Sequence, residues 1–469
     1  MKKLFICLSA LGMILIGCSK NDGNESDKPN DNNGNGQPEI PNDPNDVCSS
    51  MDDLSFISYC YENFDINKDG IISVSEADAV REIEIFGDQI KSLKGIERFP
   101  NLESLYCSSP IEEVNLQYNL KLTSFRFNQS LKKILLPNSL QTIKANTFSR
   151  CTSLTDINLP SNLVSIEARA FSGCTSLANI NFPTDSRLSS IGYMAFENCT
   201  SLTEINFPAK LGVIKEKAFS GCTNLTNINF PAFSHLASIE KDAFVDSGLI
   251  NINFPTNAPN LTSIGREVFR NCKSLKKILF PSYIRTIEAS AFCECTSLTD
   301  ITFSSNSNLT SIGDWAFSGC TNLTNINLPS NLTSIGACAF YDCSSLTNIS
   351  FPASLTTIWG SAFSGCTNLT NINFHHSSNL TSIYDGVFRG CSSITDISLP
   401  QNLTSIGKYA FGDCSPTNVT CYALIPPKNM VNSFMDWIGI KDLYVPIESI
   451  QAYKNSSFWN NIQNILPIE

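Results

Sequence analysis

Residues 174–196 read CTSLANINFPTDSRLSSIGYMAF, and this phrase recurs every 23 or 25 residues between Cys151 and Cys414. A phenylalanine closes it in twelve successive units: Phe148, Phe171, Phe196, Phe219, Phe244, Phe269, Phe292, Phe317, Phe340, Phe363, Phe388 and Phe411. A fixed period of this length is typical of a solenoid, because one unit cannot bury its apolar face alone and must stack on its neighbours. The repeat therefore predicts one continuous stacked body.

Each unit contains two short extended pieces. In the quoted unit, Leu177, Ile180 and Phe182 have the spacing of a leucine-rich-repeat strand, with alternate side chains pointing inward. Pro183 ends this strand, and residues 188–191 return the chain. The pattern predicts a leucine-rich-repeat solenoid, an α/β-class horseshoe of mostly short parallel strands.

The solenoid is expected over residues 83–419, with shorter and less regular units up to residue 140. Terminal units of a solenoid are atypical because they cap an otherwise open core. The repeat is lost in residues 420–469, which still contain Leu443-Tyr444-Val445-Pro446 and several aromatic residues. We interpret this segment as a C-terminal cap.

A cysteine follows the phenylalanine by three residues in eleven of the twelve units, and Ser247 is the exception. Cysteines at one position of neighbouring coils would lie about 4.8 Å apart with parallel Cα–Cβ bonds. A disulfide needs converging Cβ atoms, about 3.8 Å apart. The repeat therefore predicts a column of buried free thiols, while the pairing of six further cysteines stays open: Cys48, Cys60, Cys107, Cys293, Cys338 and Cys421.

The N-terminus begins with two lysines and an apolar run too short to span a bilayer, and then reads Leu-Ile-Gly-Cys at residues 15–18. This ending resembles the bacterial lipobox, which implies a lipoprotein signal peptide over residues 1–17 and lipidation of Cys18. The alternative is an ordinary cleaved signal with an incidental cysteine, but the expected small-x-small site is absent. Residues 18–46 are rich in Asn, Asp, Gly and Pro and are expected to form a disordered tether. The predicted location is the outer membrane at the cell surface, through the lipid anchor.

The composition argues against several classes of partner. The chain has 32 Lys and Arg against 43 Asp and Glu, a net charge of −11. Nucleic acid is therefore not expected as a partner, and a membrane is expected only through the lipid anchor. The three histidines, His235, His375 and His376, are not near any nucleophile signature, so we expect no enzyme activity. We expect a monomer.

Residues 65–76 read DINKDGIISVSE and match the twelve-residue EF-hand loop at every diagnostic position. A hard cation needs six or seven oxygen ligands, and alternate residues of such a loop supply them. The candidate calcium ligands are Asp65, Asn67, Asp69, the carbonyl of Ile71, Ser73 and Glu76. The alternative is a polar turn without metal. If calcium binds, a structural role is favoured over a regulatory one because there is a single loop.

Apolar residues flank this loop at helical spacing. Leu54, Ile57, Tyr61 and Phe64 precede it, and a second helix carrying Ala77, Val80 and Ile83 could follow. Residues 47–82 are therefore expected to be a small helical EF-hand-like segment that precedes the solenoid.

The repeat phrase A-F-x-x-C-x-x-L-x-x-I-x-(L/F)-P, from Phe148 to Cys414, resembles the BspA-like leucine-rich-repeat family of bacterial surface proteins. The lipobox and the terminal cap also resemble the surface lipoproteins of this family. The resemblance implies the solenoid fold specifically and a ligand only loosely, since some members are associated with adhesion to host matrix proteins or other cells.

The outward positions of the repeat strands are polar and nearly uncharged. The candidate partner-binding residues are Asn179, Asn181, Asn227, Asn229, Asn251, Asn253, Lys277, Asn325 and Asn327. Regularly spaced amides can hydrogen-bond an extended partner across many coils, although asparagine can also be a soluble filler copied by duplication. Exposed aromatics, which glycan sites usually carry, are absent from these positions. We therefore expect binding of an extracellular protein, in adhesion, through the concave face, with surface glycan binding in polysaccharide capture as the alternative.

Overall fold

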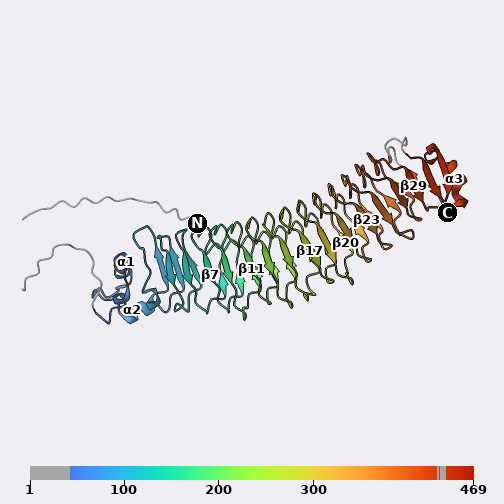
Figure 1. Ribbon diagram of the computed structural model, residues 1–469. Helices are drawn as coiled ribbons and strands as arrows, with labels where there is room; N and C mark the ends of the chain where they lie inside the picture. Colours follow the sequence, from blue (N-terminus) through green and yellow to red (C-terminus); the bar gives the residue numbers. More distant parts are fainter. Residues whose placement is uncertain (1–42, 430–432, 434–439, 469) are drawn as a thin grey trace, which may run out of the picture. The chain divides into compact units, whose positions relative to one another are not determined.

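The computed structural model describes residues 43–429, 433 and 440–468 (Figure 1). The predicted signal peptide, Cys18 and residues 18–42 of the predicted tether lie outside the described residues. No helix among the described residues is long and apolar enough to cross a membrane.

The repeats form a parallel β-solenoid, and each of its turns, here called a coil, contributes two strands (Figure 1). The first strands of the repeating coils are β7 (Asp156–Asn158), β9 (Asn179–Asn181), β11 (Glu204–Asn206), β13 (Asn227–Asn229), β15 (Asn251–Asn253), β17 (Lys277–Phe280), β19 (Asp300–Phe303), β21 (Asn325–Asn327), β23 (Asn348–Phe351), β25 (Asn371–Phe374), β27 (Asp396–Leu399) and β29 (Asn418–Cys421). Of these strands, β11 to β29 belong to one twelve-stranded sheet, and β7 pairs with β9 in a separate two-stranded sheet. The predicted leucine-rich-repeat solenoid is confirmed.

The second strands are two residues long and pair from coil to coil. They are β6 (Thr142–Ile143), β8 (Ser165–Ile166), β10 (Ser190–Ile191), β12 (Val213–Ile214), β14 (Ser238–Ile239), β16 (Ser263–Ile264), β18 (Thr286–Ile287), β20 (Ser311–Ile312), β22 (Ser334–Ile335), β24 (Thr357–Ile358), β26 (Ser382–Ile383), β28 (Ser405–Ile406) and β30 (Lys428–Asn429). They form sheets of five and eight strands, and the break between β14 and β16 falls at the coil of Ser247. In that coil one residue separates Ser247 from Leu249, whereas two separate Cys222 from Leu225.

The core between the two strand layers is a stack of identical side chains. Phe171 and Phe196 have nearly parallel rings with centroids 4.9 Å apart, and Phe196 and Phe219 repeat this at 5.1 Å. Offset stacking of this kind adds to the energy of burying the ring area. The phenylalanine column therefore fixes the alignment of each coil on the next.

The cysteine column is buried and unpaired, as predicted, and the other six cysteines of the described residues are also free thiols. Each column thiol is close to the main-chain oxygen of a phenylalanine in the preceding coil, for example Cys222 Sγ at 3.2 Å from Phe196 O. Burial raises the pKa of Cys222 to about 12, so this thiol stays protonated and can donate. The column therefore consists of small apolar groups that also satisfy the backbone.

The turn that follows each second strand contains two residues with positive φ. The first position holds Asn146, Arg169, Met194, Lys217, Asp242, Glu267, Ser290, Trp315, Cys338, Ser361, Gly386 and Tyr409, and the second is richer in Gly, Asn and Asp. Hydrogen bonds between coils continue through this turn, from Arg169 N to Tyr193 O and from Phe171 N to Ala195 O. These bonds hold a conformation that bulky residues rarely adopt alone.

The N-terminal units are shorter than the repeats. They contain β1 (Glu82–Ile85), β2 (Ser104–Cys107), β3 (Glu113–Asn115), β4 (Ser124–Arg126), β5 (Lys133–Leu135) and the 3₁₀ turn η2 (Ile96–Arg98). The strands pair in the order β1-β2-β4 and β3-β5. Ser104 pairs with Ser124, a step of 20 residues, so these coils are less regular, as predicted.

The predicted helical segment contains η1 (Val47–Ser50), α1 (Leu54–Phe64) and α2 (Val74–Ala79). Asp53 caps α1 by accepting hydrogen bonds from Ser55 N and Phe56 N. The expected second helix is shorter than its apolar spacing suggested: Val80 is already extended, and Ile83 lies in β1 and pairs with Leu105. Here the pairing of β1 with β2 outweighs the helical periodicity of the local sequence.

At the C-terminal end the sheet continues past the repeats. β31 (Asp442–Val445) pairs with β29, and β32 (Asn464–Pro467) pairs with β31. Between them lie η4 (Ile447–Ser449), α3 (Ile450–Lys454) and η5 (Trp459–Asn461). Trp459 is fully buried and donates from Nε1 to Pro427 O at 3.0 Å, which ties this segment to the last coil. Residues 430–432 and 434–439 of the predicted cap lie outside the described residues.

Candidate functional site

The outward side chains of the first strands, here called the strand face, are exposed while the isoleucine between them is buried. In β9, β15 and β21 this gives an exposed, buried, exposed pattern for Asn-Ile-Asn. The alternation follows from the period of two along a strand. The same alternation holds in β13, where Asn227 and Asn229 are half-buried. The strand face is thus a polar surface carried by a rigid sheet.

Many of these amides hydrogen-bond to one another from coil to coil. Asn179 Nδ2 donates to Asp156 Oδ1 at 2.8 Å, and Asn181 Nδ2 donates to Asn158 Oδ1 at 3.0 Å. Asn229 and Asn253 continue the series, because Asn253 Nδ2 donates to Asn229 Oδ1 at 3.0 Å. This amide ladder gives part of the asparagine repeat a structural role.

Other candidate residues are outside the ladder. Within the described residues, the side-chain amides of Asn251 and Asn327 have no hydrogen-bond partner, and both are exposed. The amide of Asn227 donates to the neighbouring Thr226 Oγ1 at 3.0 Å, and Asn325 Oδ1 accepts from Thr347 Oγ1 at 3.4 Å. Sequence alone could not separate these residues, because bonded and free amides occupy the same repeat position.

The middle of the strand face interrupts the asparagine pattern. Lys277 on β17 forms a 3.2 Å salt bridge with Asp300 on β19, and this bond lowers the pKa of the Asp300 carboxyl. Leu279, two residues after Lys277, points outward and is 60% exposed. Asn251, Lys277, Asp300 and Asn325 are in register on four neighbouring strands. We call Asn251, Lys277, Leu279, Asp300 and Asn327 the central patch.

The loop between α1 and α2 closes on its own side chains. Asp65 Oδ2 accepts from Gly70 N at 2.9 Å, and Asp69 Oδ1 accepts from Ile71 N at 3.0 Å. Gly70, at the sixth position of the loop, has φ of +82°, which a residue with a Cβ rarely adopts. Glu76 accepts from Ile66 N at 3.0 Å and from Ser73 N at 2.9 Å. The Ser73 bonds lower the pKa of Glu76 and complete a capping box for α2.

One oxygen atom of this loop is suited to bind a cation. Asp65 Oδ1 is buried and has no hydrogen-bond partner within the described residues. An unpaired buried carboxylate oxygen is costly, and a bound cation would satisfy it. No group of three or more His, Cys, Asp or Glu side chains in the described residues is arranged to hold a metal by itself. A calcium ion here would therefore also need Asn67, Ser73 and the carbonyl of Ile71.

Comparison with protein families agrees with this architecture. The model of the BspA-type leucine-rich-repeat region matches residues 118–247, 213–328 and 310–434 in six copies. The chain belongs to the BspA-type leucine-rich-repeat family.

Solved structures of similar proteins come from several bacteria. A leucine-rich repeat protein from Bacteroides ovatus is 25% identical over 70% of this BspA-type chain and 88% of that chain, with a TM-score of 0.48. A leucine-rich cell surface protein from Faecalibacterium prausnitzii is 23% identical over 58% and 87% of the two chains, with a TM-score of 0.30. The pneumococcal vaccine antigen PcpA is 18% identical over 83% and 85%, with a TM-score of 0.37. Comparison with curated proteins finds no match.

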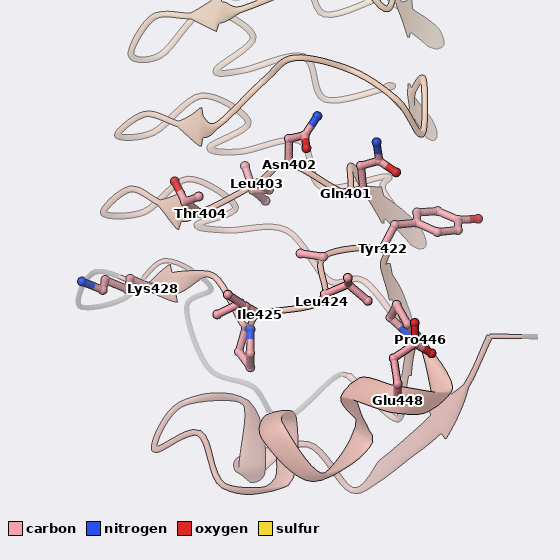
Figure 2. A pocket seen from close by; sticks show the side chains of 12 residues that line it. Gln401, Asn402, Leu403, Thr404, Tyr422, Leu424, Ile425, Lys428, Pro446 and Glu448 are labelled. Carbon is pink, nitrogen blue, oxygen red and sulfur yellow. The ribbon is translucent and has the colours of Figure 1, made fainter.

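The BspA-type solenoid also has a cavity of about 670 Å³ between its last coil and the C-terminal segment (Figure 2). Figure 2 shows Asn402 and Leu403 on one side of it and Leu424, Ile425 and Pro446 on the other. The repeat pattern does not predict this cavity. The apolar run that follows β29, including the exposed Leu424 and Ile425, is the signal that could have indicated it.

Proposed function

We propose that this protein binds a protein partner through its strand face, without catalysis, as a lipid-anchored protein of the cell surface. The observation that carries the proposal is the central patch, where an exposed leucine is surrounded by polar side chains on neighbouring strands. Leucine-rich-repeat solenoids present rigid surfaces of this kind to macromolecules. The charged and amide groups around Leu279 match the polar rim of a protein interface.

The chemistry of the central patch indicates how a partner would be held. Burying the exposed side chain of Leu279 against an apolar group of the partner would supply the largest single contribution. The free amides of Asn251 and Asn327 would each donate and accept hydrogen bonds without disturbing the ladder. Lys277 and Asp300 offer charges of both signs, which favours a partner with a complementary pair. Adhesion to host matrix or to other cells is the biological setting that we propose.

The experiment compares two exposed apolar residues on different surfaces. Beads coated with residues 43–469 are tested for retention on extracellular matrix proteins. Leu279→Ser is expected to lower retention at least tenfold. Val164→Ser is the matched control. Val164 is also exposed, but it directly precedes the second strand β8 and lies outside the strand face, so this variant is expected to leave retention unchanged. Equal retention of both variants would refute the role of the strand face.

Lipid anchoring through Cys18 and the tether 18–46 is a separate part of the proposal. It is supported by the lipobox-like sequence Leu-Ile-Gly-Cys. Metabolic labelling with an alkyne fatty acid should label the wild-type protein and not Cys18→Ser. Protease treatment of intact cells should then remove the solenoid if the anchor holds it at the outer surface of the outer membrane. Labelled Cys18→Ser, or a solenoid that the protease cannot reach, would contradict the corresponding part.

Calcium binding in the loop 65–76 is proposed as a structural clip between α1 and α2. The unpaired Asp65 Oδ1 and the positive φ of Gly70 support it. A clip at this place would hold the helical segment that covers the N-terminal end of the solenoid core.

A further inference from the structure

The turn after each second strand, here called the turn edge, changes character along the chain. In the coils around residues 241–270 it carries ion pairs, such as Lys241 with Glu267 and Arg270 with Glu267. Five consecutive later coils retain one such pair, Arg389 with Asp413, and add aromatic rings: Trp315, Tyr341, Trp359, Tyr384 and Tyr409. Aromatic residues of the turn edge are therefore concentrated in one stretch of the solenoid, and Tyr193 is the one earlier example.

Two of these rings form a stacked pair at the surface. Trp359 and Tyr384 directly follow β24 and β26, and their ring centroids lie 5.0 Å apart with planes 24° from parallel. They are 47% and 41% exposed. The same position holds Gly336 in the coil before and Gly407 in the coil after.

Neither glycine can be replaced by a larger residue without a clash. A Cβ at Gly336 would lie 2.4 Å from Asp314 N, and a Cβ at Gly407 would lie 2.6 Å from Asp385 N. The repeat position on both sides of the ring pair is thus kept free of side chains. The outer ring face of Trp359 and that of Tyr384 are therefore not covered by a side chain at the same repeat position of the neighbouring coil.

A carboxylate fixed by the backbone accompanies each aromatic pair. Asp385 Oδ1 accepts from Lys408 N at 2.7 Å, and Asp314 Oδ1 accepts from Ala337 N at 2.7 Å. The second oxygen of each carboxylate has no hydrogen-bond partner within the described residues, and both residues are exposed. Asp314 precedes Trp315, which packs against Tyr341 at a centroid distance of 5.7 Å.

We propose that this aromatic part of the turn edge binds a saccharide chain. A pyranose ring has an apolar C–H face that packs on an aromatic face and hydroxyl groups that donate to carboxylates. Trp359 and Tyr384 supply the first kind of contact, and Asp385 and Asp314 supply the second. The coils of Trp315 and Trp359 are two steps apart, an axial rise of about 10 Å, which is close to the length of two linked hexoses.

Other ligand classes fit this surface less well. The free carboxylates would repel a nucleic acid backbone. A quaternary ammonium group is usually enclosed by several converging rings, whereas Trp359 and Tyr384 lie nearly parallel. The proposal concerns a different surface from the strand face and does not depend on protein binding there.

Affinity electrophoresis tests the proposal directly. Residues 43–469 are run in native gels that contain a mixed-linkage β-glucan, a xylan, a galactomannan or a soluble starch. Retardation by at least one polysaccharide is expected, and the double variant Trp359→Ala/Tyr384→Ala should weaken it at least tenfold. Asp385→Asn should weaken it several-fold, because the amide oxygen can still accept from Lys408 N but the charge is lost.

Two controls separate this site from other effects. Phe233, which is 73% exposed in a different loop, supplies a matched aromatic control, and Phe233→Ala should leave retardation unchanged. Leu279→Ser should also leave it unchanged, so that failure of the strand-face proposal stays distinguishable. The saccharide proposal is refuted if no polysaccharide retards the protein, or if the double variant is retarded like the wild type. A double variant that loses binding to a protein but not to a polysaccharide would also refute the proposal.

Discussion

The Sγ atom of Cys174 donates a hydrogen bond to the main-chain oxygen of Phe148 in the preceding coil, 3.0 Å away. The same bond recurs along the column as far as Cys414 and Phe388, also at 3.0 Å. Each of these oxygens is also the acceptor of a turn within its own coil, for example from Cys151 N to Phe148 O. The thiols therefore join consecutive coils through the core without covalent bonds.

Removing one such thiol should weaken the solenoid modestly. Cys222→Val keeps roughly the same volume but loses the bond to Phe196 O, which retains only its bond from Cys199 N. We expect a loss of about 0.5–1.5 kcal/mol in the free energy of unfolding, measured by urea denaturation. Ser247→Cys places a cysteine at the one column position that lacks it, and it should change the free energy of unfolding by less than Cys222→Val does. A Cys222→Val variant as stable as the wild type would show that the thiol only fills space.

Thiol reactivity should follow burial. The 17 cysteines of the described residues are free, and among them only Cys293 and Cys338 are partly exposed. Burial raises the pKa of both, so their thiolate fraction is low at pH 7 and their alkylation rate should increase as the pH rises past 9. Mass spectrometry after brief alkylation of the native protein should find these two modified first. Alkylation in denaturant without reductant should find all of them, and cysteines linked from coil to coil would contradict the stacking.

Calcium should stabilise the N-terminal segment. At a calcium concentration 10–100 times the dissociation constant, the expected gain is about 1.4–2.7 kcal/mol. Asp65→Ala should abolish the gain and the heat of binding in titration calorimetry. Asp88→Ala, a change at an exposed acid outside the loop, is the control and should retain both. Absence of binding heat at millimolar calcium would leave the loop as a polar turn without metal.

Asp242 should make stability depend on pH. Burial raises the pKa of its carboxyl, and the neighbouring Glu267 raises it further, against the opposing effect of Lys241. The folded state therefore prefers the protonated acid, so its contribution is fully present below the unfolded pKa of about 3.9 and is lost as pH rises through the folded value. Asp242→Asn mimics the protonated form and also suits the positive φ of 57°. The variant should melt at a higher temperature than the wild type at pH 7, with the difference shrinking towards pH 3. A lower melting temperature at pH 7 would mean that the ion pair with Lys241 dominates.

The amide ladder should matter for stability, whereas the free amides should not. Asn229→Ala removes a donor to Asn206 Oδ1 and an acceptor for Asn253 Nδ2, with an expected cost of about 1 kcal/mol. Asn251→Ala, on the neighbouring strand, should change the melting temperature by less than the error of measurement. The two variants are compared by thermal denaturation. Equal losses would show that exposure, and not the ladder, governs these sites.

The sequence by itself determined the solenoid, the column of unpaired thiols and the inward and outward alternation of the strands. A repeated apolar spacing can be buried in only one way when units stack, so the period carries the fold. The candidate calcium ligands could likewise be named from a fixed local spacing, because the loop closes within twelve residues.

Only the tertiary structure decided how identical repeat positions differ from one another. Asn229 belongs to the ladder and Asn251 does not, because a hydrogen bond depends on the side chain presented by the adjacent coil. Ile83 joined a strand against its helical spacing because Leu105 lies beside it. Trp359 and Tyr384 lie 25 residues apart in the sequence and stack only because two coils are adjacent. Contacts between coils are set by stacking geometry, which no single unit of sequence contains.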